Sequence, residues 1–277
     1  MQVTPHVYRL HIAEDRDDGG IMHPGGSNIY FVGDPSQEMV VIDTGEHYRE
    51  WTRRILEFYA GLGSPRISAI VITHGHGDHI GGLDRLQERM NCPVRCHPKL
   101  ADRLGHVLGQ ENVLKLGSRE AIKTGGGVTL RALFTPGHED DHVCYYLPRE
   151  RVMFSGDTIL GASSSTVSNL YDYMRSLEVL ARYRPKTICP GHGPVVTDAT
   201  SRIQSYIVHR QERERQVIIA LERGITNVDD IVRYVYPPNL HKGLRGAAAR
   251  NVLTHLAKLK REGRVVETPA TYTLPGG

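Results

Sequence analysis

The stretch THGHGDHIGG, Thr73 to Gly82, constrains the fold of this chain more than any other ten residues. It follows RISAIVIT, an apolar run rich in β-branched residues that is typical of a strand buried on both faces. It leads into apolar residues at helical spacing, namely Ile80, Leu83, Leu86 and Met90. The histidines therefore lie between the end of a strand and the start of a helix, where open α/β sheets usually place their sites.

Four side chains in this loop are potential metal ligands: His74, His76, Asp78 and His79. Imidazole and carboxylate groups suit zinc and similar divalent ions. The chain has 15 histidines, so one or two could be neighbours by chance, but four ligands directly after a strand indicate a metal site. Glycines at positions 75, 77, 81 and 82 are expected to turn the backbone tightly, in conformations that residues with a Cβ adopt only at a cost.

Three further candidate ligands follow expected strands later in the chain. They are His138 in FTPGHEDDH, Asp157 in FSGDT and His192 in ICPGHG. Each has a glycine next to it, as in the first loop. Seven ligands exceed the four that one tetrahedral zinc takes, so the sequence predicts two metal ions.

The chain before residue 205 divides into two halves with a similar pattern of expected strands and helices. NIYFVGD and EMVVIDTGE predict strands, and HYREWTRRILEFYAGLG predicts a helix closed by Gly63. The second half repeats the style with GVTLRALFTPGH, HVCYYLPRERVMFSGDT, a helix over DYMRSLEVLARY and a last strand in TICPGHG. Two halves whose strands end in His or Asp predict an α/β fold of two packed sheets with helices outside, a four-layer αββα sandwich.

The pattern changes after about residue 205 to three helices and a hairpin, an arrangement that resembles a winged helix. We expect a catalytic domain over residues 1–207 and a C-terminal helical, winged-helix-like domain over 208–277. Thr226 and Asp229 have the spacing of a capping box at one helix start. Two roles stay open for this region: a helical cap that walls the substrate pocket, or nucleic-acid docking through helix 244–262.

Charge is unevenly distributed along the chain. The formal net charge is +3, yet residues 203–277 carry 12 Lys and Arg against 7 Asp and Glu. This excess indicates either an acidic partner or a solvated helix face.

The cysteines and the N-terminal sequence indicate the cellular compartment in which the protein is expected. Cys92, Cys96, Cys144 and Cys189 are too few and too scattered for a disulfide framework, so we expect reduced, mostly buried thiols. No stretch approaches the length of a membrane span, and the N-terminus lacks an apolar core of the signal-peptide type. We therefore expect no membrane partner and a cytoplasmic protein, or one of the mitochondrial matrix in a eukaryote.

The order His-x-His-x-Asp-His, PGH, GDT and PGHG resembles the metallo-β-lactamase-fold hydrolases over roughly residues 1 to 200. The resemblance implies that His74, His76 and His138 bind one zinc and that Asp78, His79 and His192 bind the other. It implies that Asp157 bridges the two. Other divalent ions such as Mn²⁺ or Fe²⁺ suit the same ligands.

Further segments resemble the beta-lactamase-like protein 2 branch, whose members include a mitochondrial single-strand endoribonuclease: TPGHEDDH, FSGDTILG, LYDYMRSL, PGHGPV and YIVHRQERERQ. Fungal acyl-carrier-protein thioesterases of this fold are similar too. The resemblance implies a dinuclear zinc hydrolase that uses a metal-bridging hydroxide, with single-stranded RNA as the preferred substrate. The alternative is a small thioester or ester, cleaved by a thioester hydrolase of the glyoxalase II or acyl-carrier-protein type. Glu139 departs from the pattern, because Thr is usual after PGH.

A flavodiiron-type redox module also uses this fold, but it tends to place a carboxylate where this chain has His76. A non-catalytic scaffold is disfavoured because all seven ligands are intact. No protein nucleophile is needed for metal-assisted hydrolysis, and Ser155 is expected to be structural. A homodimer is compatible with the sequence.

Asp78 and Asp157 are the expected catalytic carboxylates, Asp78 by orienting the hydroxide and Asp157 by setting the metal separation. Substrate contacts are predicted for Asn28, His142 and Tyr171. Each has a structural alternative: turn chemistry for Asn28, support of the site or an ordinary loop position for His142, and a helix core for Tyr171 with its neighbour Tyr173. If RNA is the substrate, four cations are expected to bind phosphates: Lys258, Lys260, Arg261 and Arg264.

Overall fold

The computed structural model describes residues 1–13, 26–268 and 271–273. Its first sheet has the strand order β1 (Gln2–Thr4), β2 (Val7–Ile12), β3 (Ser27–Asp34), β4 (Glu38–Ile42), β5 (Arg66–Val71), β6 (Val94–Cys96) and β7 (Val113–Lys115). The second sheet has the order β12 (Thr187–Pro190), β11 (Val152–Gly156), β10 (Val143–Leu147), β9 (Val128–Phe134) and β8 (Ala121–Thr124). Strands β4 to β7 run parallel, as do β11 and β12.

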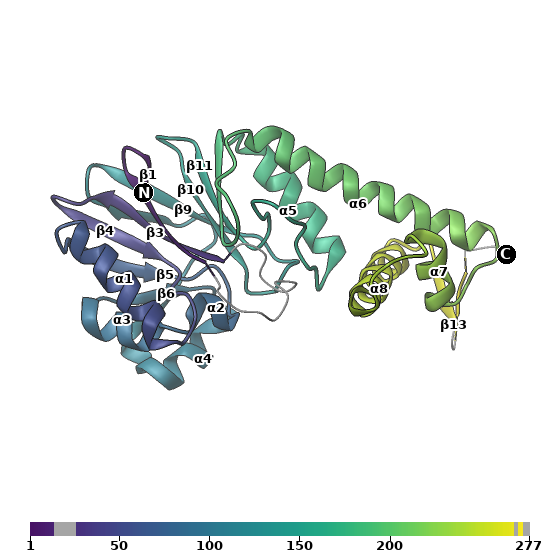
Figure 1. Ribbon diagram of the computed structural model, residues 1–277, viewed down its shortest axis with the longest axis horizontal. Helices are drawn as coiled ribbons and strands as arrows, with labels where there is room; N and C mark the ends of the chain where they lie inside the picture. Colours follow the sequence, from purple (N-terminus) through teal and green to yellow (C-terminus); the bar gives the residue numbers. More distant parts are fainter. Residues whose placement is uncertain (14–25, 269–270, 274–277) are drawn as a thin grey trace.

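Helices cover the outer faces of both sheets (Figure 1). The first sheet packs against α1 (Arg49–Gly61), α3 (Leu83–Met90) and α4 (Pro98–Leu108), whereas the second packs against α5 (Leu170–Arg182) and the start of α6 (Ala199–Glu222). Successive side chains of a strand point to opposite faces of the sheet, so one strand can pack against two layers. Ile29 and Phe31 of β3 face the helices, and Tyr30 faces the other sheet. There the Tyr30 ring lies 5.2 Å from the Phe154 ring.

Three apolar clusters, one between the sheets and one on each outer face, confirm the predicted αββα sandwich. A fourth forms the core of the C-terminal unit, which comprises α7 (Val228–Val235), α8 (Arg245–Arg261), β13 (Val266–Thr268) and β14 (Thr271–Thr273) beside the far half of α6 (Figure 1). The predicted hairpin corresponds to β13 and β14, although its turn at 269–270 lies outside the described residues. Two short 3-10 turns span 110–112 and 242–244.

Helix α6 is one continuous helix that crosses the expected boundary between residues 207 and 208. Buried side chains at both ends place its first half on the second sheet and its last half in the C-terminal unit. The division into residues 1–207 and 208–277 stays a prediction, but α6 gives the two parts a rigid connection rather than a linker.

Two local predictions were wrong. The helix expected from Ile80 is two helices, α2 (Gly77–Ile80) and α3, because the chain turns between them at Gly81 and Gly82. The predicted capping box at Thr226 does not cap α7: the Asn227 side chain instead accepts a hydrogen bond from the Asp229 backbone N–H at 2.9 Å.

All four cysteines are free and buried, as predicted. Burial raises the pKa of the Cys92 thiol to about 11 and that of Cys96 to about 12. Within the described ranges, no helix combines the length and the apolar character needed to cross a membrane.

Candidate metal centre

All seven predicted ligands lie at one edge of the sandwich, where strands from both sheets end. His74 follows β5, His138 follows β9, Asp157 follows β11 and His192 follows β12. Helix α2 presents Asp78 and His79 immediately after the first loop. The sequence predicted that these side chains follow strand ends, and in the structure they lie close to one another.

One cluster consists of His74, His76, His138 and Asp157. The Nε2 atom of His74 lies 3.0 Å from Nδ1 of His76, and that atom lies 3.3 Å from Nε2 of His138. His76 thus turns Nδ1 inward, whereas the other two histidines turn Nε2 inward. Three ring nitrogens directed at one point are the donor arrangement of a divalent metal site.

A second cluster consists of Asp78, His79 and His192. Nε2 of His192 lies 3.0 Å from Oδ2 of Asp78 and 3.3 Å from Nε2 of His79. The Asp157 carboxylate lies between the two clusters: its Oδ2 is 3.8 Å from Nε2 of His138 and 3.4 Å from Nε2 of His192. One carboxylate is therefore within reach of both groups, as a bridging ligand must be.

Buried negative charge dominates the electrostatics of the second cluster. Burial lowers the pKa of His79, but Asp78 and Asp43 outweigh it and raise that pKa to about 9. Burial is likewise outweighed at His192, where Asp157 and Asp78 raise the pKa to about 11. By contrast, burial lowers the pKa of His74 and of His138, which keeps those rings neutral.

These shifts fit a bound cation. Buried carboxylates need compensating positive charge, and a divalent ion can take the place of the protons on His79 and His192. Oδ1 of Asp157 is buried without a hydrogen-bond partner among the described residues, although it lies 3.5 Å from Nε2 of His79. The donor set, the facing ring nitrogens and this oxygen fit two divalent ions. Metal binding must then release protons, so affinity falls as pH falls.

Asp43 supports the centre from the end of β4, and the sequence prediction missed it. Its carboxylate accepts a hydrogen bond from Nδ1 of His79 at 2.8 Å and also binds the backbone N–H and side chain of Thr73. Asp43 adopts a φ of 62°, a left-handed conformation that aspartate tolerates better than most residues with a Cβ. The available signal was an aspartate directly after a buried strand, the same pattern that revealed Asp157.

Two more groups contact the ligands from outside the clusters. Glu139 stands after PGH, where Thr is usual, and its Oε1 lies 3.1 Å from Nε2 of His76. His142 is fully buried, and its Nε2 accepts a hydrogen bond from the Asp157 backbone N–H at 3.1 Å. Its burial favours support of the site, one of the alternatives for His142, over a contact with substrate.

The other predicted substrate residues lie apart from the cluster atoms. The Asn28 amide is buried and donates to the carbonyls of Pro190 and Gly193, while its oxygen accepts from Arg9 and contacts His11. These contacts fill the amide's hydrogen-bonding capacity, which favours the structural alternative.

Three further side chains have clear surroundings. Tyr171, on α5, packs its ring against the Arg261 guanidinium at 3.9 Å, and its contact with substrate stays a prediction. Its neighbour Tyr173 is fully buried and donates to the Thr158 carbonyl, as the core alternative predicted. Ser155 is buried and donates to the Ile159 carbonyl at 2.7 Å, so its structural assignment is confirmed.

The proposed reason for the glycines of the first loop was wrong. None of Gly75, Gly77, Gly81 and Gly82 has a positive φ. A Cβ at Gly81 would lie 2.3 Å from the His47 backbone nitrogen, and one at Gly82 would lie 2.7 Å from the Thr44 carbonyl oxygen. Close backbone approach, not an unusual conformation, therefore requires glycine at these two positions; Gly77 has open space.

The four cations expected to bind phosphates are all paired with carboxylates. Lys258 lies 2.7 Å from Glu214 and Arg264 lies 3.2 Å from it; Lys260 lies 2.6 Å from Glu267, and Arg261 lies 3.4 Å from Asp172. Any phosphate would have to displace these partners. The C-terminal charge excess therefore overstates the positive charge available between residues 258 and 264.

Known proteins match this chain over both of its parts. Residues 22–192 match the Metallo-beta-lactamase superfamily, and residues 228–271 match the Beta-lactamase associated winged helix domain. A Beta-lactamase-like protein 2 homolog of Caenorhabditis elegans is 35% identical over 261 residues, which is 91% of this chain and 85% of that protein. An atrochrysone carboxyl ACP thioesterase of Aspergillus novofumigatus is 31% identical, over 95% of this chain and 81% of that protein.

The fold also matches a solved structure. A beta-lactamase domain protein from Burkholderia ambifaria superimposes with a TM-score of 0.81 at 20% identity, covering 99% of this chain and 93% of that one. At this low sequence identity, the structural similarity is evidence for the fold alone. Together with a histidine and aspartate centre compatible with a metal-dependent hydrolase, the matches show that this chain belongs to the metallo-beta-lactamase superfamily and carries that superfamily's associated winged-helix domain.

Proposed function

We propose that this chain is a dinuclear zinc hydrolase that cleaves single-stranded RNA. The observation that carries the hydrolase assignment is the position of Asp157 between two clusters of ring nitrogens and carboxylates. Two divalent ions held there would lower the pKa of a bound water and would supply positive charge for the attacking and leaving oxygens. His74, His76 and His138 would hold one ion, Asp78, His79 and His192 the other, with Asp157 shared.

Asp78 is the group suited to orient the attacking water. Burial opposes ionisation, but His79 and His192 hold the pKa of this carboxyl well below its usual range. It therefore stays a carboxylate at neutral pH and can accept a hydrogen bond from water. With Ser155 buried and bonded to the Ile159 carbonyl, it offers no nucleophile at the centre.

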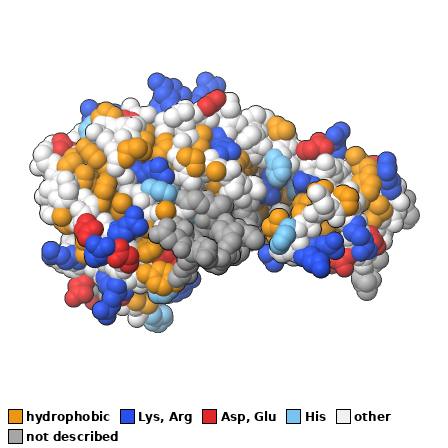
Figure 2. Space-filling view, in the orientation of Figure 1, with side chains coloured by type: hydrophobic (Ala, Val, Ile, Leu, Met, Phe, Trp, Pro, Cys, Tyr) orange, Lys and Arg blue, Asp and Glu red, His pale blue; other side chains and the backbone are white. Residues whose placement is uncertain are grey.

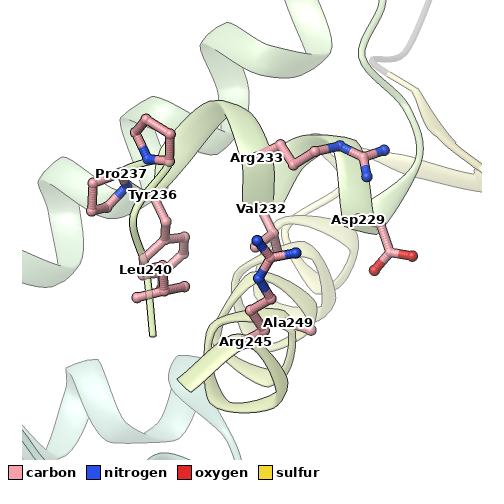
Figure 3. A pocket seen from close by; sticks show the side chains of 9 residues that line it. Asp229, Val232, Arg233, Tyr236, Pro237, Leu240, Arg245 and Ala249 are labelled. Atoms are coloured by element: carbon pink, nitrogen blue, oxygen red, sulfur yellow. The ribbon is translucent and has the colours of Figure 1, made fainter. Parts of the chain in front are cut away.

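A cavity in the C-terminal unit supports a polymeric substrate (Figure 3). It has a volume of about 410 Å³ and lies between α7, the segment 236–240 and the start of α8. Apolar side chains, the Tyr236 ring and the Asp229 carboxylate line it, together with Arg233 and Arg245. Arg233 pairs with Asp230, but no carboxylate in the described part of the chain lies within ion-pair distance of Arg245.

The Arg213 guanidinium covers one face of the Tyr236 ring at 4.2 Å, so a base of single-stranded nucleic acid would stack on the other face while Arg245 neutralises a phosphate. Figure 2 shows further Lys and Arg side chains interleaved with apolar ones on the same unit. We therefore propose a phosphate contact at Arg245, at the start of α8, rather than at the four paired cations between residues 258 and 264.

Thioester hydrolysis is the second candidate. The 31% identity to a fungal acyl-carrier-protein thioesterase, over 95% of this chain, favours it, as does the pairing of all four cations between residues 258 and 264. The metal centre would serve either reaction, because both are attacks of activated water on an electrophilic centre.

A panel of substrates distinguishes the two candidates. The zinc-loaded protein is incubated with labelled single-stranded RNA, a lactoylglutathione thioester and a lactone, and Asp78→Ala serves as the control for contaminating activity. We expect internal RNA cleavage that Asp78→Ala abolishes. Turnover of the thioester with the RNA left intact would instead establish the second candidate.

A second arm of the same assay tests the cavity. Arg245→Gln should weaken RNA binding and lower the log–log salt slope by about 0.7 for each phosphate that the variant no longer neutralises. Arg223→Gln is the matched control, because Arg223 is an exposed arginine that contacts Tyr234 outside the cavity. Equal salt slopes for the two variants would show that the cavity does not bind RNA, and would leave the hydrolase assignment unaffected.

A further inference from the structure

Metal ligand His138 depends on a loop that has no regular secondary structure. Its Nδ1 donates to the Thr166 carbonyl oxygen at 2.8 Å and lies 3.2 Å from Oγ of Ser165. These contacts fix the ring so that Nε2 faces the cluster. The orientation of the His138 ring therefore depends on the position of segment 163–168, which lies between β11 and α5.

Arg210 of α6 holds this segment from the opposite side. Only 3% of Arg210 is exposed, and its guanidinium donates to the Ser165 carbonyl oxygen. A second nitrogen donates to Oδ1 of Asn251 on α8 at 3.3 Å, and the group lies 5.5 Å from the centroid of the Tyr173 ring. One side chain thus connects the loop behind His138 with α5 and the C-terminal unit.

Burying this charge is unfavourable for folding alone. Among the described residues, Arg210 has no carboxylate within ion-pair distance, and its Nε lacks a hydrogen-bond partner. A buried charge without a counter-ion loses its hydration without full compensation, so an apolar residue at this position would favour stability. The planar fork of arginine can bind two carbonyl-type acceptors at fixed angles, which a lysine ammonium cannot do in the same way.

We infer that Arg210 is a positioning residue for the His74, His76 and His138 site, through which the C-terminal unit holds one side of the metal centre in place. The inference rests on the proposed metal centre but on neither candidate substrate. Loss of the guanidinium frees the Ser165 carbonyl, lets segment 163–168 shift and turns the His138 ring away from its partners. In the described part of the chain, the hydrogen bonds of segment 163–168 reach His138 and not the second cluster, so we expect the affinity of the second cluster to stay unchanged.

Metal affinity tests the inference separately from catalysis. Zinc binding to Arg210→Gln is measured by competition with a chromogenic chelator, and the cobalt-substituted protein is examined by visible absorption. We expect one of the two sites to weaken by about 10- to 100-fold, the usual effect of removing support from a ligand histidine, and its cobalt bands to change. The other site should keep its wild-type affinity.

Arg213→Gln is the matched control. Arg213 lies on α6 one turn further on, stacks on Tyr236 at 4.2 Å and donates to the Val235 carbonyl, but does not contact segment 163–168. It should bind both ions as the wild type does. Equal losses in the two variants, or wild-type affinity and cobalt bands in Arg210→Gln, would overturn the inference.

Arg210→Lys keeps the test decisive if Arg210→Gln does not fold. Lysine retains the buried charge but loses the planar fork, so it cannot hold Ser165 and Asn251 in the same geometry. With an unchanged near-ultraviolet circular dichroism spectrum, this variant should still show weaker binding at one site. Wild-type affinity at both sites would contradict the inference here as well.

Discussion

Asp157→Ala should lower turnover by more than about a hundredfold while the fold stays intact. The Asp157 carboxylate lies within reach of both clusters, so it sets the separation on which placement of the attacking water depends, and an error of about 1 Å alone can cost that factor. The backbone N–H of Asp157 keeps its bond to His142, which limits the structural damage. Turnover, metal content and circular dichroism are measured together.

Asp140→Ala is the control for this variant. Asp140 is an exposed carboxylate near the same edge, paired with Lys99 at 2.9 Å and outside both clusters. It should keep normal turnover and metal content. If Asp157→Ala retains near-normal turnover, the bridging assignment is wrong.

Gly191→Ala should damage the centre by a different route. Gly191 immediately precedes His192 and has no positive φ, so alanine can adopt its backbone conformation. An added Cβ would lie 2.5 Å from Oδ1 of Asp157 and 2.8 Å from Cε1 of His79. Because one of these groups must move, we expect weaker metal binding and a loss of turnover of about a hundredfold or more.

Gly77→Ala is the comparison for the glycine variant. Gly77 lies between His76 and Asp78, yet a Cβ there would meet nothing within 4 Å. It should bind metal as the wild type does, as shown by elemental analysis and thermal unfolding with and without zinc. A Gly191→Ala protein with wild-type metal content would show that the centre relaxes more easily than its packing indicates.

The positions of the ligands could be predicted because their signal is local. His74 to His79 lie together in the chain, and His138, Asp157 and His192 each follow a strand directly. The four layers were predictable for a similar reason, since strand and helix periodicity report burial residue by residue.

The supports of the ligands could not be predicted, because they are contacts between distant segments. Asp43 meets His79 across 36 residues, and Arg210 meets Ser165 across 45. The pairing of Lys258 and Arg264 could not be predicted for the same reason: Glu214 of α6, which lies beside both, precedes them by more than 40 residues. Net charge summed along the sequence contains no such pairing.

The number of metal ions bound per chain tests the central claim most directly. The protein is loaded gently with zinc, freed of excess metal by gel filtration and measured by elemental analysis. With seven ligand side chains in two clusters that share Asp157, we expect close to two zinc ions per chain. One ion or fewer in a folded, fully loaded protein would contradict a dinuclear centre.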